Sequence, residues 1–446
     1  MFKKILIANR GEIAVRIIRA CRDMGIVSLA VYSEADKDAL HSHIADESVC
    51  IGPAAARESY LNVERVISAA LSSGADAIHP GYGFLSENSR FVELCGEHGI
   101  TFIGPTPENI RLLGDKAQAV ITAQKAGAPT VPGSNGLLKS LGHAGEVAGK
   151  IGYPVMLKAS SGGGGRGIRL VASANEMQSA WDNARAEALA CFGDDGVYLE
   201  KYIASPRHIE IQILADKHGN TIHLGERECS LQRRHQKVLE ESPSPFLSSE
   251  TRARMGADAV SIARQAGYVG AGTIEFLAGQ DKNYYFMEMN PRIQVEHPVT
   301  ELVTGRDIVL EQIRIALGEH LGYNQSDVIQ SGHAIECRVC AEDPAKSFAP
   351  CPGEIKSLNV PGGPGVRVDS SVYQGYKIPP YYDSLIAKLI VHDHDRPGAI
   401  TRMKRAMAEF LVDGVSTNCD FHLELLKNPD FTSGEYCIDT LEKLMN

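Results

Sequence analysis

A run of four glycines, Gly162 to Gly165, lies just after Lys158 in the segment KASSGGGGRGI (158–168). Glycine loses more backbone entropy on folding than any other residue, so such a run needs a reason. Successive N–H groups without side chains can form a concave nest for an anion, and the lysine adds a positive charge. The segment indicates a loop that covers nucleotide phosphates, with a plain flexible hairpin tip as the alternative.

Two glutamates in the segment GTIEFLAGQDKNYYFMEMN (272–290) are spaced for a metal site. If this segment is a hairpin that turns on Asp281 and Lys282, Glu275 and Glu288 lie directly opposite one another. Like charges in that position destabilise a sheet, and a divalent cation between them removes the repulsion. Oxygen ligands favour Mg²⁺ or Mn²⁺ that bridge to phosphates, so the spacing predicts a metal–nucleotide site.

Polar residues continue at every second position along the next segment, which reads MEMNPRIQVEHP. They are Glu288, Asn290, Arg292, Gln294 and Glu296. An extended chain points residues of this period to one face, so a binding face is predicted, with a half-solvated strand as the alternative. Pro291 cannot donate to a ladder, so the run lies at a sheet edge or leaves the sheet.

The segment QRRHQK (232–237) is a basic cluster in an acidic chain. Gln232, His235 and Lys237 share one parity of an expected extended loop. They suit a ligand site, and a plain basic surface is the alternative.

Two more segments place single side chains at strand ends or faces. Tyr82 in HPGYGFLSEN (79–88) follows an apolar strand, and ligands of α/β sheets bind at the carboxyl ends of strands. In ECRVCAEDP, Glu336 and Arg338 share one strand face. An isolated arginine at such a place is commonly a salt-bridge partner, so this segment alone leaves its role open.

The elements that position these residues fall into three regions. Strands and helices alternate in residues 1–130, which predicts a parallel, Rossmann-like sheet. No G-x-G-x-x-G follows the first strand, so a nicotinamide cofactor is not favoured. Residues 131–203 form a small lobe around the glycine hairpin, and residues 204–446 mix longer antiparallel strands with helices. The predicted fold class is α/β.

Composition narrows the classes of function. The chain has 446 residues, 43% hydrophobic residues and a net charge of −10, which disfavours binding of nucleic acid by bulk charge. No apolar run approaches the roughly 20 residues that span a bilayer, so no membrane partner is expected. Ten scattered cysteines in a large chain indicate reduced thiols and a cytoplasmic location.

The motifs together resemble one known family. Further motifs are ANRGEIAVR, FIGPTPENIRLLGDK, YLEKYI, RHIEIQ and PPYYDS, and the whole set follows in order along almost the entire chain. It resembles the biotin carboxylases, which are ATP-grasp ligases. The resemblance implies an ATP-grasp fold with an N-terminal Rossmann-like domain (1–130), a small glycine-loop lid domain (131–203) and a C-terminal mixed α+β catalytic domain (204–446).

The resemblance also implies roles for single residues. ATP is assigned to Lys116, Lys158, Gly162, Gly163, Gly164, Gly165, Glu200, Lys201, Ile203, His208, Gln232 and His235, with the adenine held at 200–203 largely by backbone. Two Mg²⁺ or Mn²⁺ ions are assigned to Glu275, Glu288 and Asn290. Bicarbonate is assigned to Lys237, Arg292, Gln294 and Val295, with Glu296 as general base. Biotin is assigned to Arg338, Tyr82 and Asp383.

The implied reaction is the ATP-dependent carboxylation of biotin with bicarbonate through carboxyphosphate, which is the first half-reaction of acetyl-CoA carboxylase in fatty acid synthesis. Propionyl-CoA, pyruvate or another acyl carboxylase remains the alternative, because this part of the enzyme does not encode the final acceptor. Implied partners are a biotin carboxyl carrier protein, carboxyltransferase subunits and a second copy of the chain. Two other functions remain as alternatives. One is carbamoyl-phosphate synthetase, whose sequence is internally duplicated, whereas this sequence shows no such duplication. The other is a non-catalytic nucleotide-binding subunit.

The biotin-bearing lysine is expected on another protein. A carrier presents its lysine on a tight hairpin in a motif that resembles Ala-Met-Lys-Met. The Met-Lys pair here is Met403-Lys404, and apolar residues around it recur at helical spacing. The sequence therefore predicts an amphipathic helix at 398–412 and a separate subunit without its own carrier or carboxyltransferase.

Overall fold

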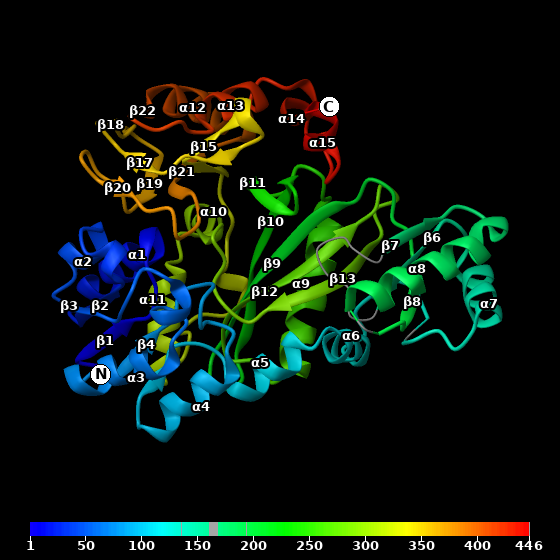
Figure 1. Cartoon of the computed structure of the whole chain (residues 1–446), viewed down its shortest axis with the longest axis horizontal. Helices are drawn as coiled ribbons and strands as arrows, with labels where there is room; N and C mark the ends of the chain where they lie inside the picture. Colours follow the sequence, from blue (N-terminus) through cyan, green and yellow to red (C-terminus); the bar gives the residue numbers. More distant parts are fainter. Residues whose placement is uncertain (135, 160–167, 193, 446) are drawn as a thin grey trace.

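The computed structural model describes residues 1–134, 136–159, 168–192 and 194–445. Figure 1 shows three parts: an N-terminal α/β unit, a small lobe that projects from the body, and a large antiparallel sheet that carries the C-terminal elements on one side. No helix in these described ranges has the length and apolar character that crossing a membrane requires.

The N-terminal unit is a parallel five-stranded sheet in the order β3-β2-β1-β4-β5, which confirms the predicted Rossmann-like pattern. Its strands are β1 (Lys4–Ile7), β2 (Val27–Tyr32), β3 (Glu47–Cys50), β4 (Ala77–His79) and β5 (Thr101–Phe102), and its helices are α1 (Gly11–Asp23), α2 (Leu40–Ile44), α3 (Val63–Ser73) and α4 (Ser89–Glu97). Strand order reverses between β1 and β4, so the loops after these strands meet at the edge where ligands bind. Asn9 joins the loops, because its Nδ2 donates to the carbonyls of Pro80 and Tyr82 at 2.7 Å each.

The projecting lobe holds an antiparallel sheet in the order β7-β6-β8. It consists of β6 (Val155–Ala159), β7 (Ile168–Val171), β8 (Val197–Lys201), α7 (Leu141–Ile151) and α8 (Met177–Phe192). The pairing of β6 with β7 confirms the hairpin around the glycine run. Residues 160–167, and with them Gly162, Gly163, Gly164 and Gly165, lie outside the described residues.

The third sheet has eight antiparallel strands in the order β13-β12-β9-β10-β11-β14-β21-β19. Their bounds are β9 (Arg207–Ala215), β10 (Thr221–Arg233), β11 (Gln236–Ser242), β12 (Gly270–Ala278), β13 (Tyr284–Asn290), β14 (His333–Cys340), β19 (Val366–Ser370) and β21 (Leu385–Asp393). One face packs apolar side chains against α6 (Lys116–Lys125) and α9 (Ser249–Gln265). The polar residues of the sequence motifs on these strands therefore lie on the opposite face of the sheet.

The remaining elements surround this sheet. The helices are α5 (Pro107–Gly114), α10 (His297–Thr304), α11 (Ile308–Ala316), α12 (Arg396–Glu409), α13 (Cys419–Leu425), α14 (Pro429–Ser433) and α15 (Thr440–Met445). The short strands are β15 (Glu342–Asp343), β16 (Ala349–Pro350), β17 (Gly353–Glu354), β18 (Ser357–Asn359), β20 (Lys377–Ile378) and β22 (Leu411–Asp413). Helix α12 confirms the helix predicted around Met403-Lys404, and the Met403 side chain is buried.

The hairpin of β12 and β13 confirms the predicted pairing of Glu275 with Glu288. The register changes directly beside this pair, because Phe276 is opposite Phe286 and Met287 is the extra residue of a β-bulge. Burial along β13 follows the change: Met287 and Glu288 are both half-buried, although they are sequence neighbours. The bulge therefore places two adjacent side chains on the cleft side of the sheet.

Two expectations of extended chain are wrong. The alternating run ends with β13 at Asn290, and Glu296 is the N-cap residue of α10 rather than part of a strand. The strand ends directly before Pro291 and is also the edge strand of its sheet, which agrees with the expectation that proline cannot continue a ladder. QRRHQK is a tight hairpin tip instead of an extended loop: Arg234 (φ 50°) and His235 (φ 64°) form a two-residue turn between β10 and β11.

Candidate active site

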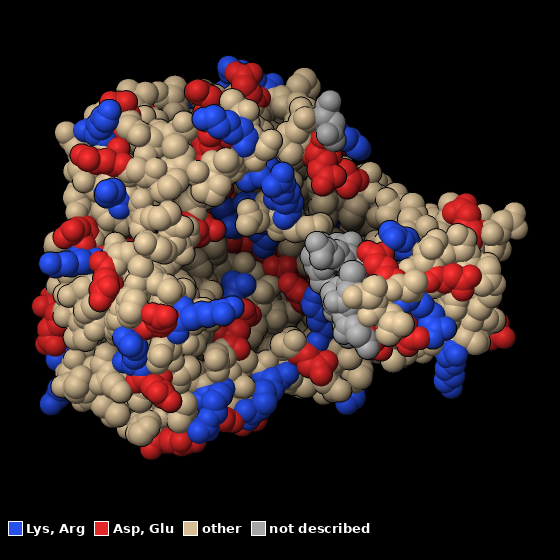
Figure 2. Space-filling model, viewed as in Figure 1, with Lys and Arg blue, Asp and Glu red and all other residues tan. Residues whose placement is uncertain are grey.

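A cleft of about 1140 Å³ lies where the N-terminal unit, the lobe and the large sheet meet. Figure 2 shows the hollow with basic and acidic side chains along its walls. Nearly all described residues that the sequence singled out line it. They are Tyr82, Lys116, Lys158, Glu200, Lys201, Ile203, His208, Gln232, His235, Lys237, Glu275, Glu288, Asn290, Arg292, Gln294, Val295, Arg338 and Asp383. Glu296 and Glu336 are exceptions, since neither lines the cleft and both are fully buried.

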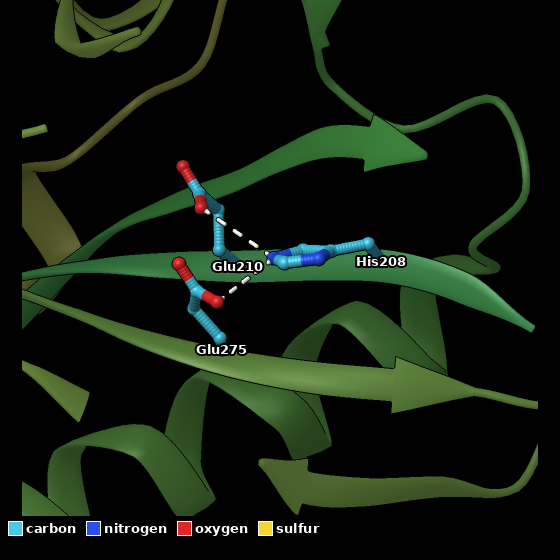
Figure 3. A group of neighbouring side chains, drawn as sticks. All are labelled: His208, Glu210 and Glu275. Atoms are coloured by element: carbon cyan, nitrogen blue, oxygen red, sulfur yellow. Dashed lines mark ion pairs between the residues drawn. The ribbon is translucent and has the colours of Figure 1, made fainter. Parts of the chain in front are cut away.

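Glu275 is the more heavily contacted of the two opposed carboxylates. Its Oε1 accepts hydrogen bonds from Asn290 Nδ2 at 2.9 Å and Gln294 Nε2 at 3.0 Å. Its Oε2 lies 3.1 Å from His208 Nε2, as Figure 3 shows. Burial by itself would raise the pKa of Glu275, but Lys237 and His208 outweigh it and hold that pKa below the ordinary range. Glu275 is therefore an anion.

Glu288 is in a different electrostatic position. Its side chain is 35% exposed, and its Oε2 lies 4.0 Å from Lys116 Nζ. Partial burial, and then the charge of Glu275, raise the pKa of Glu288. Two carboxylates on one sheet face, together with the amide oxygen of Asn290, form a set of hard oxygen donors. Such a set fits Mg²⁺ or Mn²⁺, which would relieve the repulsion between the two carboxylates.

Lys237 connects the carboxylates of the cleft. Its Nζ lies 2.6 Å from both Glu210 Oε2 and Glu296 Oε1, and 3.3 Å from Glu275 Oε1. Burial alone lowers the pKa of a lysine, but Glu210, Glu275 and Glu296 raise the pKa of Lys237 well above its ordinary value. The ammonium is therefore positively charged and exposed to the cleft on its remaining side.

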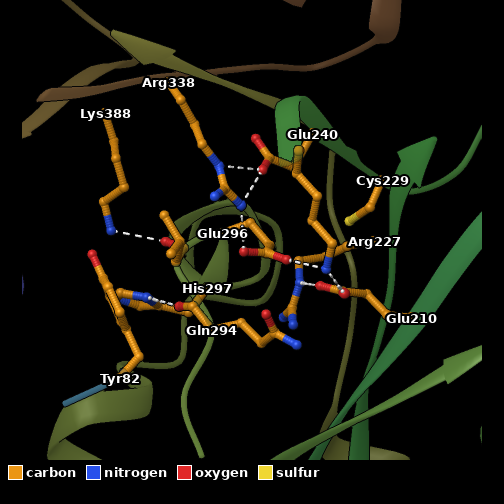
Figure 4. A network of polar contacts seen from close by, with 12 residues as sticks. Tyr82, Glu210, Arg227, Cys229, Glu240, Gln294, Glu296, His297, Arg338 and Lys388 are labelled. Atoms are coloured by element: carbon orange, nitrogen blue, oxygen red, sulfur yellow. Dashed lines mark hydrogen bonds and ion pairs between the residues drawn. The ribbon is translucent and has the colours of Figure 1, made fainter. Parts of the chain in front are cut away.

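Arg338 lines the adjoining part of the wall, and Glu296 lies directly behind it. Nη2 of Arg338 lies 2.9 Å from Glu296 Oε2 and 2.5 Å from Glu240 Oε1, so two carboxylates share one guanidinium nitrogen (Figure 4). Against the effect of burial, Lys237 and Arg338 hold the pKa of Glu296 well below its ordinary range. Burial raises the pKa of Glu240 to about 7. Arg338 is thus both a salt-bridge partner and a cleft residue.

Arg292 contacts both Asn290 of the predicted metal site and Glu87 of the N-terminal unit. Its Nη2 donates to Asn290 Oδ1 at 3.1 Å, and its Nε lies 3.3 Å from Glu87 Oε2. Gln294 and Val295 also line the cleft, where the chain turns into α10. Arg292 and Lys237 therefore bring two cations to one end of the cleft, which suits a small anion.

The lobe contributes the other end of the cleft. Lys158 on β6 is ion-paired with Glu200 on β8. The Lys201 N–H donates to Pro132 O at 2.7 Å, and that of Tyr202 donates to Pro154 O at 3.2 Å. The Ile203 N–H has no backbone acceptor among the described residues and borders the cleft. Of the backbone donors predicted at 200–203, Ile203 is the one left open for a ligand.

Sequence reasoning missed the apolar walls at this end. They are Val131, Met156, Leu277, Met287 and Ile438. Met156 lies two residues before Lys158, and Leu277 lies two residues after Glu275. The period of two along each strand was the available signal for both. Met287 could not be found in this way, because only the bulge turns it toward the cleft.

Tyr82 and Asp383 line the end of the cleft beside Arg338. The Tyr82 hydroxyl donates to Glu12 Oε1, and Asp383 Oδ1 accepts from the Leu385 N–H at 2.9 Å. Burial and the carboxylate of Glu12 raise the pKa of Tyr82 well above its ordinary value. The hydroxyl therefore stays protonated as a donor.

Comparisons with known proteins agree along the whole chain. Three family models match: "Biotin carboxylase, N-terminal domain" over residues 1–110, "Carbamoyl-phosphate synthase L chain, ATP binding domain" over 115–324, and "Biotin carboxylase C-terminal domain" over 336–443. Biotin carboxylase of Nostoc is 58% identical over 99% of both chains, and biotin carboxylase 1 of Bacillus subtilis is 57% identical over 99% of this chain and 98% of its own.

Solved structures give the same result. A biotin carboxylase–ATP complex from Campylobacter jejuni has a TM-score of 0.92 at 50% identity and covers 99% of both chains. The biotin carboxylase domain of a 2-oxoglutarate carboxylase bound to bicarbonate has a TM-score of 0.95 at 50% identity, covering 99% of this chain and 98% of its own. With this identity over its full length and a matching fold, the chain belongs to the biotin carboxylase family of ATP-grasp ligases.

Proposed function

We propose that this chain carboxylates biotin on a separate carrier protein, with bicarbonate and ATP as the other substrates. The observation that carries the proposal is that Lys237 and Arg338 line one cleft with the opposed Glu275 and Glu288, and that both cations contact Glu296 directly behind the wall. An anion site, a base and a metal–phosphate site thus adjoin one another. A non-catalytic nucleotide-binding subunit has no need of this arrangement.

Lys116, Lys158 and the glycine loop are assigned to the phosphates of ATP. Apolar walls from β6, β12 and β13 suit a flat adenine ring, and the open N–H of Ile203 is the donor we assign to its edge. His208, Gln232 and His235 are assigned to the same nucleotide. Mg²⁺ or Mn²⁺ held by Glu275, Glu288 and Asn290 would neutralise charge that develops on the phosphates.

Bicarbonate is assigned to the cations Lys237 and Arg292, beside Gln294 and Val295. Glu296 is an anion before substrate binds, so it can accept the bicarbonate proton at Oε1 or Oε2. The freed oxyanion attacks the γ-phosphorus, ADP leaves, and carboxyphosphate forms. Bicarbonate paired with Lys237 would weaken the contact of that lysine with Glu296, which would raise the proton affinity of the carboxylate.

The second step transfers the carboxyl group to biotin. Carboxyphosphate releases CO₂ and phosphate, and the phosphate takes the N1′ proton of biotin. The deprotonated N1′ then attacks CO₂ to form carboxybiotin. Arg338 is assigned to the developing negative charge on the ureido oxygen, where a charge-assisted donor contributes roughly 3–4 kcal/mol. Tyr82 and Asp383 are assigned to the mouth through which the carrier presents biotin.

Measurement of ADP release by the purified chain tests the proposed activity. The proposal expects slow ATP cleavage with bicarbonate, faster cleavage on addition of free biotin, and a requirement for Mg²⁺ or Mn²⁺. An ATPase rate that is indifferent to both bicarbonate and biotin would overturn it.

The acceptor beyond biotin is a separate part of the proposal. We assign the chain to acetyl-CoA carboxylase, as a homodimer in the cytoplasm, with a carboxyl carrier protein and carboxyltransferase subunits as partners. Cysteines in the described part of the chain are free thiols, as a reducing compartment requires. The biotin carboxylase subunit of a pyruvate carboxylase is 51% identical, so pyruvate is the alternative acceptor. Mass spectrometry of proteins that co-purify with the chain distinguishes the two, and light scattering tests the dimer.

A further inference from the structure

Lys388 on β21 is a buried cation to which the proposed reaction assigns no role. Its side chain is 0% exposed, and its Nζ donates to the carbonyl oxygen of Val295 at 2.8 Å. The same Nζ lies 3.1 Å from Glu12 Oε1 and 3.9 Å from Asp369 Oδ2. A buried ammonium is unfavourable unless its donors are paired, so these partners are what retain it in the fold.

The first partner belongs to the predicted bicarbonate site. Because a trans peptide is planar, its C=O and N–H point in opposite directions. Holding the Val295 carbonyl therefore directs the N–H of Glu296 away from Lys388. Neither Val295 nor Glu296 donates its N–H to another described backbone group. His297 supplies a second brace, since its Nδ1 lies 2.8 Å from the carbonyl oxygen of Gln294.

The second partner leads to the predicted biotin end. Glu12 lies on α1, and its Oε1 accepts both the Tyr82 hydroxyl and the Lys388 ion pair. Its other oxygen is buried and has no hydrogen-bond partner among the described residues. The carboxylate therefore depends on Lys388 and Tyr82 for its stabilisation. Figure 4 shows Lys388 and Tyr82 beside the segment that carries Gln294, Glu296 and His297.

We infer that Lys388 is a positioning residue that sets the 294–296 segment and Tyr82 at the same time. The inference rests on the proposed function, because it concerns how that site is held together. Tyr82 comes from the N-terminal unit, Val295 from the chain after β13, and Lys388 from β21. One ammonium thus fixes the relative placement of the bicarbonate and biotin ends, while the nucleotide end is built from other elements.

The test compares KM values for ATP, bicarbonate and free biotin, measured from ADP release. Lys388→Met alone leaves the buried Glu12 carboxylate without its ion-pair partner, so the main variant combines Lys388→Met with Glu12→Gln. Asp369 keeps its ion pair with Arg367 at 2.7 Å in this variant. The KM values for bicarbonate and for biotin should each rise at least fivefold, with the KM for ATP unchanged within twofold.

The link to Tyr82 is tested by non-additivity. Tyr82→Phe alone should raise the KM for biotin and leave that for bicarbonate unchanged. Added to the Lys388→Met/Glu12→Gln variant, it should produce no further rise, because residues in one network are coupled. An additive rise, or an unchanged biotin KM in the main variant, would overturn the link to the biotin end.

A control removes another ion pair away from the cleft, in Arg252→Met with Glu226→Gln. Their Nε and Oε1 lie 2.6 Å apart, and Glu226 is buried while Arg252 is 26% exposed. All three KM values should stay at the wild-type level there. If all three KM values change equally in the main variant, or if the KM for bicarbonate is unchanged, Lys388 does not position the bicarbonate end. Either result would overturn the inference. Absence of bicarbonate-stimulated cleavage in the wild-type chain would instead refute the proposed function.

Discussion

Glu275 and Glu288 are direct cross-strand partners on β12 and β13, yet their surroundings are unequal. Glu275 has close contacts with Lys237, His208 and Asn290, whereas Glu288 forms an ion pair with Lys116 at 4.0 Å and with no other described residue. The less compensated carboxylate is therefore the one that gains most from a metal ion.

Glu288→Gln should separate stability from metal binding. Removing one of two opposed charges should raise the metal-free free energy of unfolding by about 0.2–1 kcal/mol. The same change should reduce the rise in unfolding temperature that Mg²⁺ and ATP produce, because one anionic ligand becomes neutral. Thermal unfolding with and without Mg–ATP measures both. Glu108→Gln on the surface should alter neither quantity, and a wild-type Mg–ATP shift in Glu288→Gln would contradict the metal assignment.

Glu296→Gln tests the general base. Glutamine keeps the volume, and its one carbonyl oxygen can accept a hydrogen bond from Lys237 or from Arg338, whereas alanine would leave a cavity between these two cations. Loss of the base should reduce bicarbonate-dependent ATP cleavage by roughly 10²-fold or more, with the KM for ATP little changed. Steady-state kinetics at saturating bicarbonate measures the effect, and near-normal turnover would show that another group takes the proton.

Lys158→Met should act on the nucleotide alone. The ion pair of Lys158 with Glu200 is about a quarter exposed on both sides, so its removal should change the free energy of unfolding by less than about 1 kcal/mol. The phosphates of ATP should lose a positive partner, which should raise the KM for ATP roughly tenfold or more. Titration of ATP at fixed bicarbonate checks the change. A raised KM for bicarbonate together with an unchanged KM for ATP would show that Lys158 does not bind the phosphates of ATP.

Glu241 predicts how stability depends on pH. His333, Arg396 and Tyr436 all donate to this buried carboxylate, and against the effect of burial His333 and Arg396 lower the pKa of Glu241 to about 2. A depressed pKa stabilises the fold above the ordinary glutamate pKa, and this stabilisation is lost as pH falls from about 4.5 toward 2.

Glu241→Gln should therefore cost about 3 kcal/mol at pH 7 and roughly half of that near pH 3. Urea unfolding of wild type and variant at the two pH values gives the comparison. A deficit that stays constant with pH would mean that the carboxylate charge does not contribute.

Incubation with biotin ligase, ATP and biotin should leave the mass of this chain unchanged. Met403 is buried in α12, so Met403-Lys404 cannot be presented at the tip of a hairpin without unfolding that helix. Intact-mass spectrometry is the measurement, with a known carrier domain as positive control. A stoichiometric gain of one biotin on any lysine would show that the chain carries its own acceptor.

Much of this site could be predicted because its residues follow the period of single elements. The Glu275–Glu288 pairing, the parallel N-terminal sheet and the helix at Met403 each depend on local pattern, and each was confirmed. The extended run through Glu296 was wrong because alternation of polar residues does not reveal where a strand stops. The buried partners Glu12 and Lys388 were not foreseen, since tertiary packing alone brings α1 beside β21.

The bulge at Met287 determines which residues of β13 face the cleft. Before it, one parity of the strand faces the cleft, and after it the other parity does. Deleting Met287 would therefore have two effects. It would remove an apolar side chain from the cleft wall. It would also turn one part of the strand to the opposite face of the sheet, either the residues before position 287 or Glu288 and Asn290 after it. Variation in loop length near the cleft is tolerable by comparison, because a loop has no parity to keep.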